Sequence, residues 1–221
     1  MRKIGGLEIF FGSLFMALSF ALALTCGLTL HSTGIWIFQS EVLLWILGYL
    51  VFLTVEILRN RLFFHFFPLP EGEIPMGSKA EFFYHLYILQ YLMVFNPLTH
   101  TKALPVPIRT LLFQALGAKM GSNSFSNGVL NEPPLIEIGN NTLVGASAML
   151  IPHAIEGTRL SHEKIKLGSN VTIGANAVIL QGVVIEDDVV IAVGSVVSKG
   201  THIPRGEIWG GIPARCLKKS S

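Results

Sequence analysis

Apolar residues dominate two long stretches near the start of the chain. The first stretch, Ile9–Leu30, reads IFFGSLFMALSFALALTCGLTL and contains no charged residue. A helix of about 20 apolar residues is long enough to cross a hydrocarbon core of about 30 Å. A short polar break, 31–34, separates this stretch from Ile35–Leu58, which is again mostly apolar. The pattern predicts a hairpin of two transmembrane α-helices within residues 1–61.

Basic residues flank this hairpin on both of its outer ends. Arg2 and Lys3 precede the first stretch, and Arg59 and Arg61 follow the second. Because basic flanks favour the cytoplasmic side, we expect a location at the cytoplasmic membrane, with the following domain on its cytoplasmic side. The alternative is a cleaved signal peptide, but no A-x-A site closes the first stretch and a second apolar stretch follows it directly.

Residues 62–104 are interpreted as a linker that includes one further helix. The segment Glu81–Phe95 is strongly apolar but too short to span a bilayer comfortably. Its tyrosines, Tyr84, Tyr87 and Tyr91, suit the headgroup zone of a membrane. The sequence therefore favours an interfacial helix, and a buried helix packed against the hairpin stays open as the alternative.

The second half of the chain repeats every six residues. Aliphatic side chains occupy every sixth position from Leu167 to Ile203. This period fits neither a helix nor a plain strand, but it fits a short strand plus a tight turn, with three such units closing one triangular coil. Corner triplets such as 139–141, 168–170 and 174–176 contain Gly and Asn, which tolerate positive φ. The spacing predicts a parallel β-helix.

An earlier block of the same repeat has a phase of its own. It runs through Ile138, Val144 and Leu150, and extending it backwards meets two poor matches, Ser126 and Glu132. The repeat is thus strong after residue 138 and weak before it.

With these repeats the chain resembles the hexapeptide-repeat acyltransferases, a family with a left-handed parallel β-helix. The resemblance covers residues 105–216. Its most specific marks are VTIGANAVILQGVVI at 171–185 and the closing segment Trp209–Arg215, whose G-x-P-A-[KR] ending is typical of the family's acetyltransferases. The resemblance implies a mainly β fold with a left-handed β-helix domain over 105–221, acetyl-CoA as acyl donor, and a homotrimer with its sites between subunits. The membrane hairpin is not a general feature of the family.

A break in the repeat points to the chemistry. Leu150 and Leu167 are 17 residues apart, which is not a multiple of six, so an excursion must leave the coils between them. Loops that leave a rigid repeat often carry function. In enzymes that this sequence is similar to, a β-helix histidine is the catalytic base, and His153 matches best. Glu156 is the candidate to orient its imidazole, and His162 is a candidate substrate contact.

Further candidate residues follow from the same resemblance. In the family, the pantetheine arm of the donor runs along corner residues of the late coils, and the CoA phosphates need cations. The donor-binding candidates are small corner residues and late basic residues: Gly174, Ala192, Gly194, Lys199, Arg205 and Arg215. His100, in the approach to the β-helix, is a second candidate contact of the acceptor. Ordinary turns and solvated charges are the alternative explanation for all of these.

Composition excludes several other classes. The chain is 51% hydrophobic and only 14% charged, and its net charge of +2 comes without a basic run, so we expect no nucleic-acid partner. Two cysteines, Cys26 and Cys216, make neither a disulfide framework nor a zinc pair, and we expect no metal. A membrane location suggests membrane lipid as a partner and a saccharide or lipid-linked acceptor, with O-transfer favoured. The alternatives are a zinc-dependent carbonic anhydrase of β-helix type and a non-catalytic membrane scaffold.

Overall fold

The computed structural model of this chain describes residues 3–35, 40–101 and 104–219. It divides into two compact units, which we name the helical unit (residues 2–68 and 82–96) and the β unit (residues 69–81 and 97–221).

Two residue sets used in the sequence interpretation lie outside the described residues. They are Arg2, on which the predicted orientation partly rests, and residues 36–39 of the second apolar stretch.

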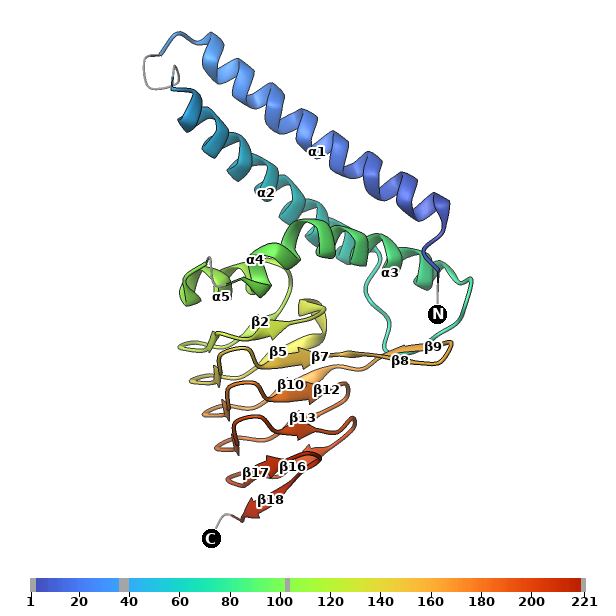
Figure 1. The fold of residues 1–221 in the computed structure, drawn as a ribbon, viewed down its shortest axis with the longest axis vertical. Coiled ribbons are helices and arrows are strands. Elements are labelled where there is room, and N and C mark those ends of the chain that lie inside the picture. The colour runs from blue at the N-terminus through green and yellow to red at the C-terminus, as the bar shows by residue number, and fades with distance from the viewer. Residues whose placement is uncertain (1–2, 36–39, 102–103, 220–221) are drawn as a thin grey trace. The chain divides into compact units, whose positions relative to one another are not determined.

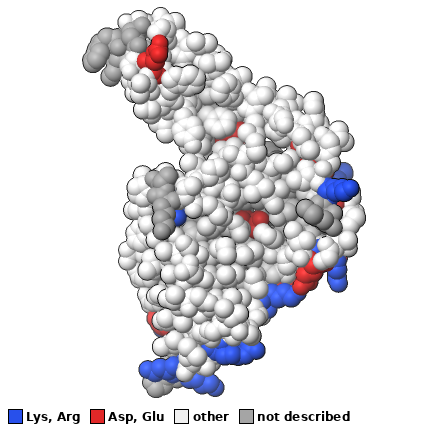
Figure 2. Space-filling view, in the orientation of Figure 1, with Lys and Arg blue, Asp and Glu red and all other residues white. Residues whose placement is uncertain are grey.

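The helical unit begins with two long helices, α1 (Gly6–Ser32) and α2 (Glu41–Phe66), which run side by side in Figure 1. Their mean hydropathies are 2.1 and 2.0, so both are long and apolar enough to cross a membrane by length and composition. The face shown in Figure 2 carries almost no charged side chains along them. The α2 helix continues past Leu58, where the predicted stretch ends.

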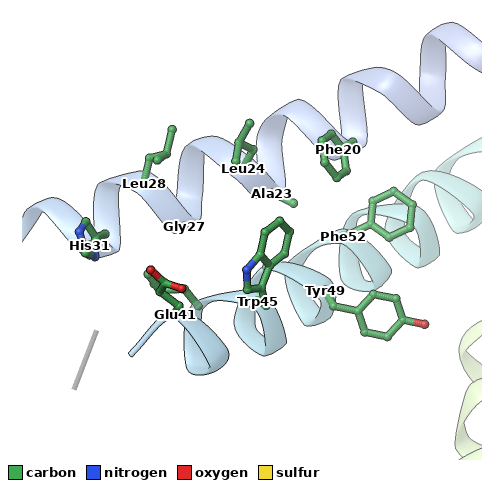
Figure 3. Close-up of a pocket in the computed structure, with 12 residues that line it drawn as sticks. Phe20, Ala23, Leu24, Gly27, Leu28, His31, Glu41, Trp45, Tyr49 and Phe52 are labelled. Carbon is green, nitrogen blue, oxygen red and sulfur yellow. The ribbon is translucent and has the colours of Figure 1, made fainter. Parts of the chain in front are cut away.

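A hollow of about 510 Å³ separates the two helices near their loop ends (Figure 3). Phe20 of α1 and Trp45 of α2 line it. Gly27 and Gly48 also line it, and a Cβ placed on either glycine would meet nothing within 4 Å. The two helices are therefore not packed together along their whole length.

The chain between the two predicted domains forms a run of helices. They are α3 (Lys79–Gln90), the π-helix η2 (Tyr91–Phe95) and α4 (Asn96–His100).

Residues 81–95, for which the sequence favours an interfacial helix, pack against the hairpin. Tyr84, Tyr87 and Tyr91 are only 2–5% exposed, and the ring of Tyr87 lies 5.0 Å from that of Phe64 in α2. Aromatic rings packed in this way gain both buried area and edge-to-face contacts. This packing agrees with the alternative, a buried helix packed against the hairpin, and the interfacial location stays a prediction.

The β unit consists of short strands in three parallel stacks (Figure 1). The first contains β2 (Lys119–Met120), β5 (Ile136–Ile138), β10 (Ile165–Leu167), β13 (Val184–Ile185) and β16 (His202–Ile203). The second contains β3 (Phe125–Ser126), β6 (Leu143–Val144), β11 (Thr172–Ile173), β14 (Val190–Ile191), β17 (Ile208–Gly211) and β18 (Ala214–Lys218). The third contains β4 (Val129–Leu130), β7 (Met149–Ile151), β12 (Val178–Leu180) and β15 (Val196–Val197). Among the described strands of these three stacks, only β18 is antiparallel to its neighbour, so the predicted parallel β-helix architecture is confirmed.

The register explains why the sequence repeats every six residues. Leu167 pairs with Ile185, which pairs with Ile203, so each coil advances 18 residues, or three repeats. These side chains are at most 4% exposed and stack in a continuous core. Ser126, a poor match to the repeat, still occupies the buried position in register with Val144.

The corner triplets use glycine and asparagine for different reasons. In the triplet 174–176, Asn176 adopts the left-handed conformation with φ 57°. A Cβ on Gly174 would lie 2.5 Å from the backbone nitrogen of Val193 in the next coil. Glycine is thus required there by close coil stacking, and the asparagine supplies the positive φ.

The first coil is covered by helix α5 (Val106–Ala115). Its Phe113 is fully buried and belongs to the core of the β-helix. The hydroxyl of Thr110 accepts a hydrogen bond of 3.1 Å from the backbone nitrogen of Ser126. The helix therefore closes an end that would otherwise expose apolar side chains and unpaired strand groups.

The predicted excursion is an antiparallel hairpin of β8 (His153–Glu156) and β9 (Arg159–His162). It projects from one side of the coil stack in Figure 1. Strand β1 (Gly72–Ile74), from far earlier in the sequence, pairs with β9 and makes a three-stranded sheet. The hairpin is held on its outer edge by strand pairing that sequence spacing does not reveal.

Candidate active site

His153 begins β8 at the point where the chain leaves the coils. Its Nδ1 lies 2.8 Å from Oε2 of Glu132. The carboxylate is 4% exposed and the imidazole 25% exposed. Because a carboxylate oxygen can only accept, Nδ1 carries the hydrogen of this bond and Nε2 keeps its lone pair. A partly exposed imidazole with this tautomer can serve as a general base.

Glu132 reaches this position because it lies two residues beyond the end of strand β4, where the coil becomes irregular. Leu130 at the end of β4 is in register with Leu150, so Glu132 falls outside the row of inward side chains. It adopts a left-handed conformation with φ 41°, and the chain then enters the short 3₁₀-helix η3 (Pro133–Leu135). A non-glycine residue held in this conformation stores backbone strain, and such strain is found at functional sites.

His162 lies beside this pair. It is the cross-strand partner of His153 at the base of the hairpin, and Gly72 of β1 pairs with it from the other side. The side chain is fully buried, and burial lowers the pKa of His162 to about 4, with the charge of Glu132 opposing that shift. His162 is therefore neutral at neutral pH and adds no positive charge beside His153.

Two effects act in opposite directions on the pKa of His153. Burial lowers the pKa of His153, whereas the hydrogen bond and the negative charge of Glu132 raise it. The two effects of Glu132 together are larger, so the pKa stands above its ordinary value. A raised pKa means that the imidazole binds a proton more strongly, which suits a general base.

The predicted pairing of His153 with Glu156 is wrong. Glu156, at the far end of β8, forms an ion pair with Lys199. That contact lowers the pKa of its fully exposed carboxyl. Glu132 supplies the carboxylate at His153 instead. The available sequence signal was its charged side chain at a poorly matching position of the six-residue repeat.

The small donor-binding candidates lie at coil corners. Gly174 and Ala192 stack in consecutive coils, and a Cβ on Gly174 would also lie 2.7 Å from the carbonyl carbon of Ala192. Gly194 has φ 67° and open space around its Cα. Coil stacking accounts for Gly174, whereas Gly194 is free to let a ligand approach the backbone.

The basic candidates lie toward the end of the β unit, where Figure 2 shows Lys and Arg side chains gathered. Besides Lys199, which pairs with the hairpin, Arg205 forms an ion pair of 2.7 Å with Asp188. The guanidinium of Arg215 donates a hydrogen bond of 3.1 Å to the carbonyl oxygen of Ala214. Each has a structural contact, and each is exposed.

His100 lies at the end of α4, where its Nδ1 is 3.4 Å from the hydroxyl of Thr99. None of the hydrogen bonds described for His100 joins it to His153, Glu132 or His162. The structure thus brings His162 to the candidate base and gives His100 a contact of its own.

The chain is similar to several known proteins with hexapeptide repeats or related sequences. The bacterial transferase hexapeptide repeat (six repeats) matches residues 164–199. A mitochondrial gamma carbonic anhydrase of Arabidopsis thaliana is 39% identical over 82 residues, 37% of this chain and 26% of the relative. The delta-poly-L-ornithine synthetase of Acinetobacter baumannii is 32% identical over 108 residues, 48% of this chain and 8% of the relative. A crystal structure of a hexapeptide-repeat acetyltransferase of Vibrio cholerae, complexed with acetyl coenzyme A, is 24% identical and covers 64% of this chain and 90% of that one, with a TM-score of 0.45.

This chain therefore spans about a quarter or less of the length of these two sequence relatives. The matched family segment contains β10 to β15, the most regular coils of the β unit. The predicted resemblance is confirmed there: residues 164–199 carry the hexapeptide repeat of the bacterial transferases.

Proposed function

We propose that this chain is a membrane-anchored acyltransferase that moves an acetyl group from acetyl-CoA to a hydroxyl of a saccharide or lipid-linked acceptor. The observation that carries the proposal is the 2.8 Å contact between Glu132 and His153, at the root of a hairpin that leaves the β-helix. An imidazole oriented by a buried carboxylate is the arrangement that general-base catalysis needs.

The reaction follows from the tautomer of His153. Its Nε2 takes the proton of the acceptor hydroxyl while the hydroxyl oxygen attacks the thioester carbonyl carbon. A tetrahedral intermediate forms, the carbon–sulfur bond breaks, and the proton passes from the imidazole to the leaving thiolate. Glu132 stabilises the imidazolium that exists between these steps, because its carboxylate lies 2.8 Å from Nδ1.

Acetyl-CoA as donor is supported by the transferase hexapeptide repeat and by the G-x-P-A-R ending, which is typical of the family's acetyltransferases. The acetyltransferase of Vibrio cholerae is described as a complex with acetyl coenzyme A. Gly194, with open space at its corner, and the exposed Lys199, Arg205 and Arg215 are the residues that we propose for the donor.

The setting of the enzyme is part of the proposal. Helices α1 and α2 cross the cytoplasmic membrane, the β unit lies on the cytoplasmic side, and the coils are left-handed in a homotrimer. The apolar lengths of the helices, the flanking basic residues and the family resemblance support these points. A catalytic domain held at a membrane suits an acceptor that is itself at the surface.

The test uses membranes that contain the full chain, incubated with radiolabelled acetyl-CoA and native cell extract. We expect label in an extractable product with the wild type and with His202→Ala, an exposed histidine of the same β-helix. His153→Ala should lose the label. Equal labelling by His153→Ala would remove it as the base, and no labelling by any variant with several acyl-CoA donors would favour a non-catalytic scaffold.

One observation favours carbonic anhydrase as a second candidate, namely the 39% identity with a plant relative of that class. Such an enzyme needs three zinc ligands. Among the residues that the structure describes, no group of three His, Cys, Asp or Glu side chains is arranged to hold a metal ion. Zinc bound stoichiometrically by the purified chain, together with CO₂ hydration, would favour this candidate over acyl transfer.

A further inference from the structure

The helical unit contains a cavity of about 220 Å³ that the proposed reaction does not use. Residues of α1, α2 and α3 line it, and all of them belong to the helical unit. Most of the wall is aromatic or aliphatic, including Phe15, Phe63 and Leu86, and two polar residues complete it, Arg59 and Gln90. A mostly apolar cavity with a few polar groups is the usual composition of a ligand site.

The polar residues form a connected cluster with Glu56, which is fully buried. Glu56 forms an ion pair with Arg59. The side-chain nitrogen of Gln90 donates to Oε2 of Glu56 at 2.8 Å and to its carbonyl at 3.0 Å. The guanidinium lies 5.5 Å from the ring of Phe15. The positive charge of Arg59 is therefore already balanced by a carboxylate.

The cluster leaves hydrogen-bonding capacity that helix packing does not use. Nη1 of Arg59 and Oε1 of Glu56 are buried and have no hydrogen-bond partner among the described residues. Burying such groups costs free energy unless a partner is supplied. Ionisable residues inside apolar helices mark functional sites for the same reason. Directly after Gln90 the backbone forms the π-helix η2, a distortion that is frequent at functional sites.

We propose that this cavity binds the acyl chain of a lipid through its ester carbonyl. The chain packs on the aromatic and aliphatic wall, and the carbonyl oxygen accepts a hydrogen bond from Arg59. Glu56 already balances the guanidinium, so an uncharged oxygen fits better than a phosphate, which the nearby carboxylate would repel. The inference rests on the proposed membrane location of α1 and α2, since Arg59 follows the apolar stretch that ends at Leu58.

The test uses the full chain reconstituted in phosphatidylcholine vesicles that contain a photoactivatable diacyl phosphatidylcholine, with the crosslinked peptides identified by mass spectrometry. Leu62→Trp fills the cavity, and Leu58→Trp is its matched control. Both leucines are 61% exposed on α2, but only Leu62 lines the cavity. We expect crosslinks in the peptides that line the cavity for the wild type and Leu58→Trp, and a loss of about tenfold for Leu62→Trp, as expected when a bound chain is displaced.

A second pair of variants tests the carbonyl contact. Arg59→Gln should reduce the same crosslinks about tenfold, the effect of losing one hydrogen bond to a charged donor. Arg61→Gln removes an exposed charge two residues away and should leave them unchanged. Competition experiments identify which lipid oxygen binds Arg59. Excess diacylglycerol, which has ester carbonyls but no phosphate, should compete with the probe. A di-ether phosphatidylcholine, which lacks the carbonyls, should compete weakly.

Several results would overturn the inference. Equal labelling of Leu62→Trp and Leu58→Trp would show only bulk lipid around the helices. Stronger competition by the di-ether lipid would assign a phosphate instead. Failure of the wild type to enter vesicles would remove the membrane location. Acetyl transfer, measured separately, reports on the proposed catalysis alone, so a failure of the lipid site can be distinguished from a failure of the catalysis.

Discussion

Oε2 of Glu132 lies 2.8 Å from Nδ1 of His153, although 21 residues separate them in the chain. One residue ends an irregular early coil, and the other begins the hairpin that leaves the next coil. Stacking of the coils brings them together, as the register of Leu130 with Leu150 shows. The pair therefore depends on a stable β-helix beneath it.

The first prediction concerns the base. His153→Gln should lower kcat for acetyl transfer by about 10²–10⁴-fold, the usual contribution of a general base. His202→Gln, which alters an exposed histidine that contacts Glu186, is the control and should retain activity. The measurement is the initial rate with saturating acetyl-CoA, and unchanged kcat in His153→Gln would contradict the assignment.

The second prediction concerns the pH dependence of the rate. Glu132 raises the pKa of His153 against the lowering effect of burial. In Glu132→Gln only burial remains, so the acidic limb of the pH–rate profile should move to lower pH while kcat falls. Glu156→Gln, whose carboxylate pairs with Lys199, should leave the limb in place. A shift in Glu156→Gln and none in Glu132→Gln would reverse the two roles.

The third prediction concerns stability in acid. Burial keeps the pKa of His162 at about 4 in the folded chain, against an ordinary value of about 6.5. As pH falls, the unfolded chain binds this proton first, so stability is present above about pH 6.5 and is lost down to about pH 4, by roughly 3 kcal/mol.

Thermal unfolding of the full chain in detergent, followed by the circular dichroism of the β unit at pH 7 and pH 5, measures this loss. The decrease in Tm between the two pH values should be smaller in His162→Gln than in the wild type. An equal decrease in both proteins would assign the acid sensitivity to other groups.

The fourth prediction concerns the core of the coils. Ile179 is fully buried in register between Leu150 and Val197. Ile179→Ala should destabilise the β unit by about 2–5 kcal/mol, because it removes buried methyl groups and leaves a cavity between coils. Val193→Ala, at a position 71% exposed, should change stability little. The measurement is denaturant unfolding, and equal effects would contradict the inward stacking.

Local patterns were enough to predict the architecture. The six-residue period from Leu167 to Ile203 predicted parallel coils, because a repeat that returns to the same face every third unit can bury its aliphatic side chains only by stacking. The gap between Leu150 and Leu167 predicted the excursion, and it identified His153 at the root of that excursion.

Contacts between distant segments could not be predicted in the same way. The sequence favoured Glu156 as the partner of His153 because it is near in the chain, but along β8 it lies at the far end and faces Lys199. The tyrosines of α3 were assigned to a membrane interface from their composition, yet they are buried against α2. Amphipathic residues suit either environment, and only packing decides between them.

The sequence by itself determined the repeat, its period of six residues and the place where it breaks, since these depend on the spacing of apolar residues along the chain. The tertiary structure alone decided that Glu132 orients toward His153 and that β1 covers the hairpin beside His162. Both depend on how successive coils and an earlier segment are brought together. The resulting burial lowers the pKa of His162, whereas the contact with Glu132 raises the pKa of His153.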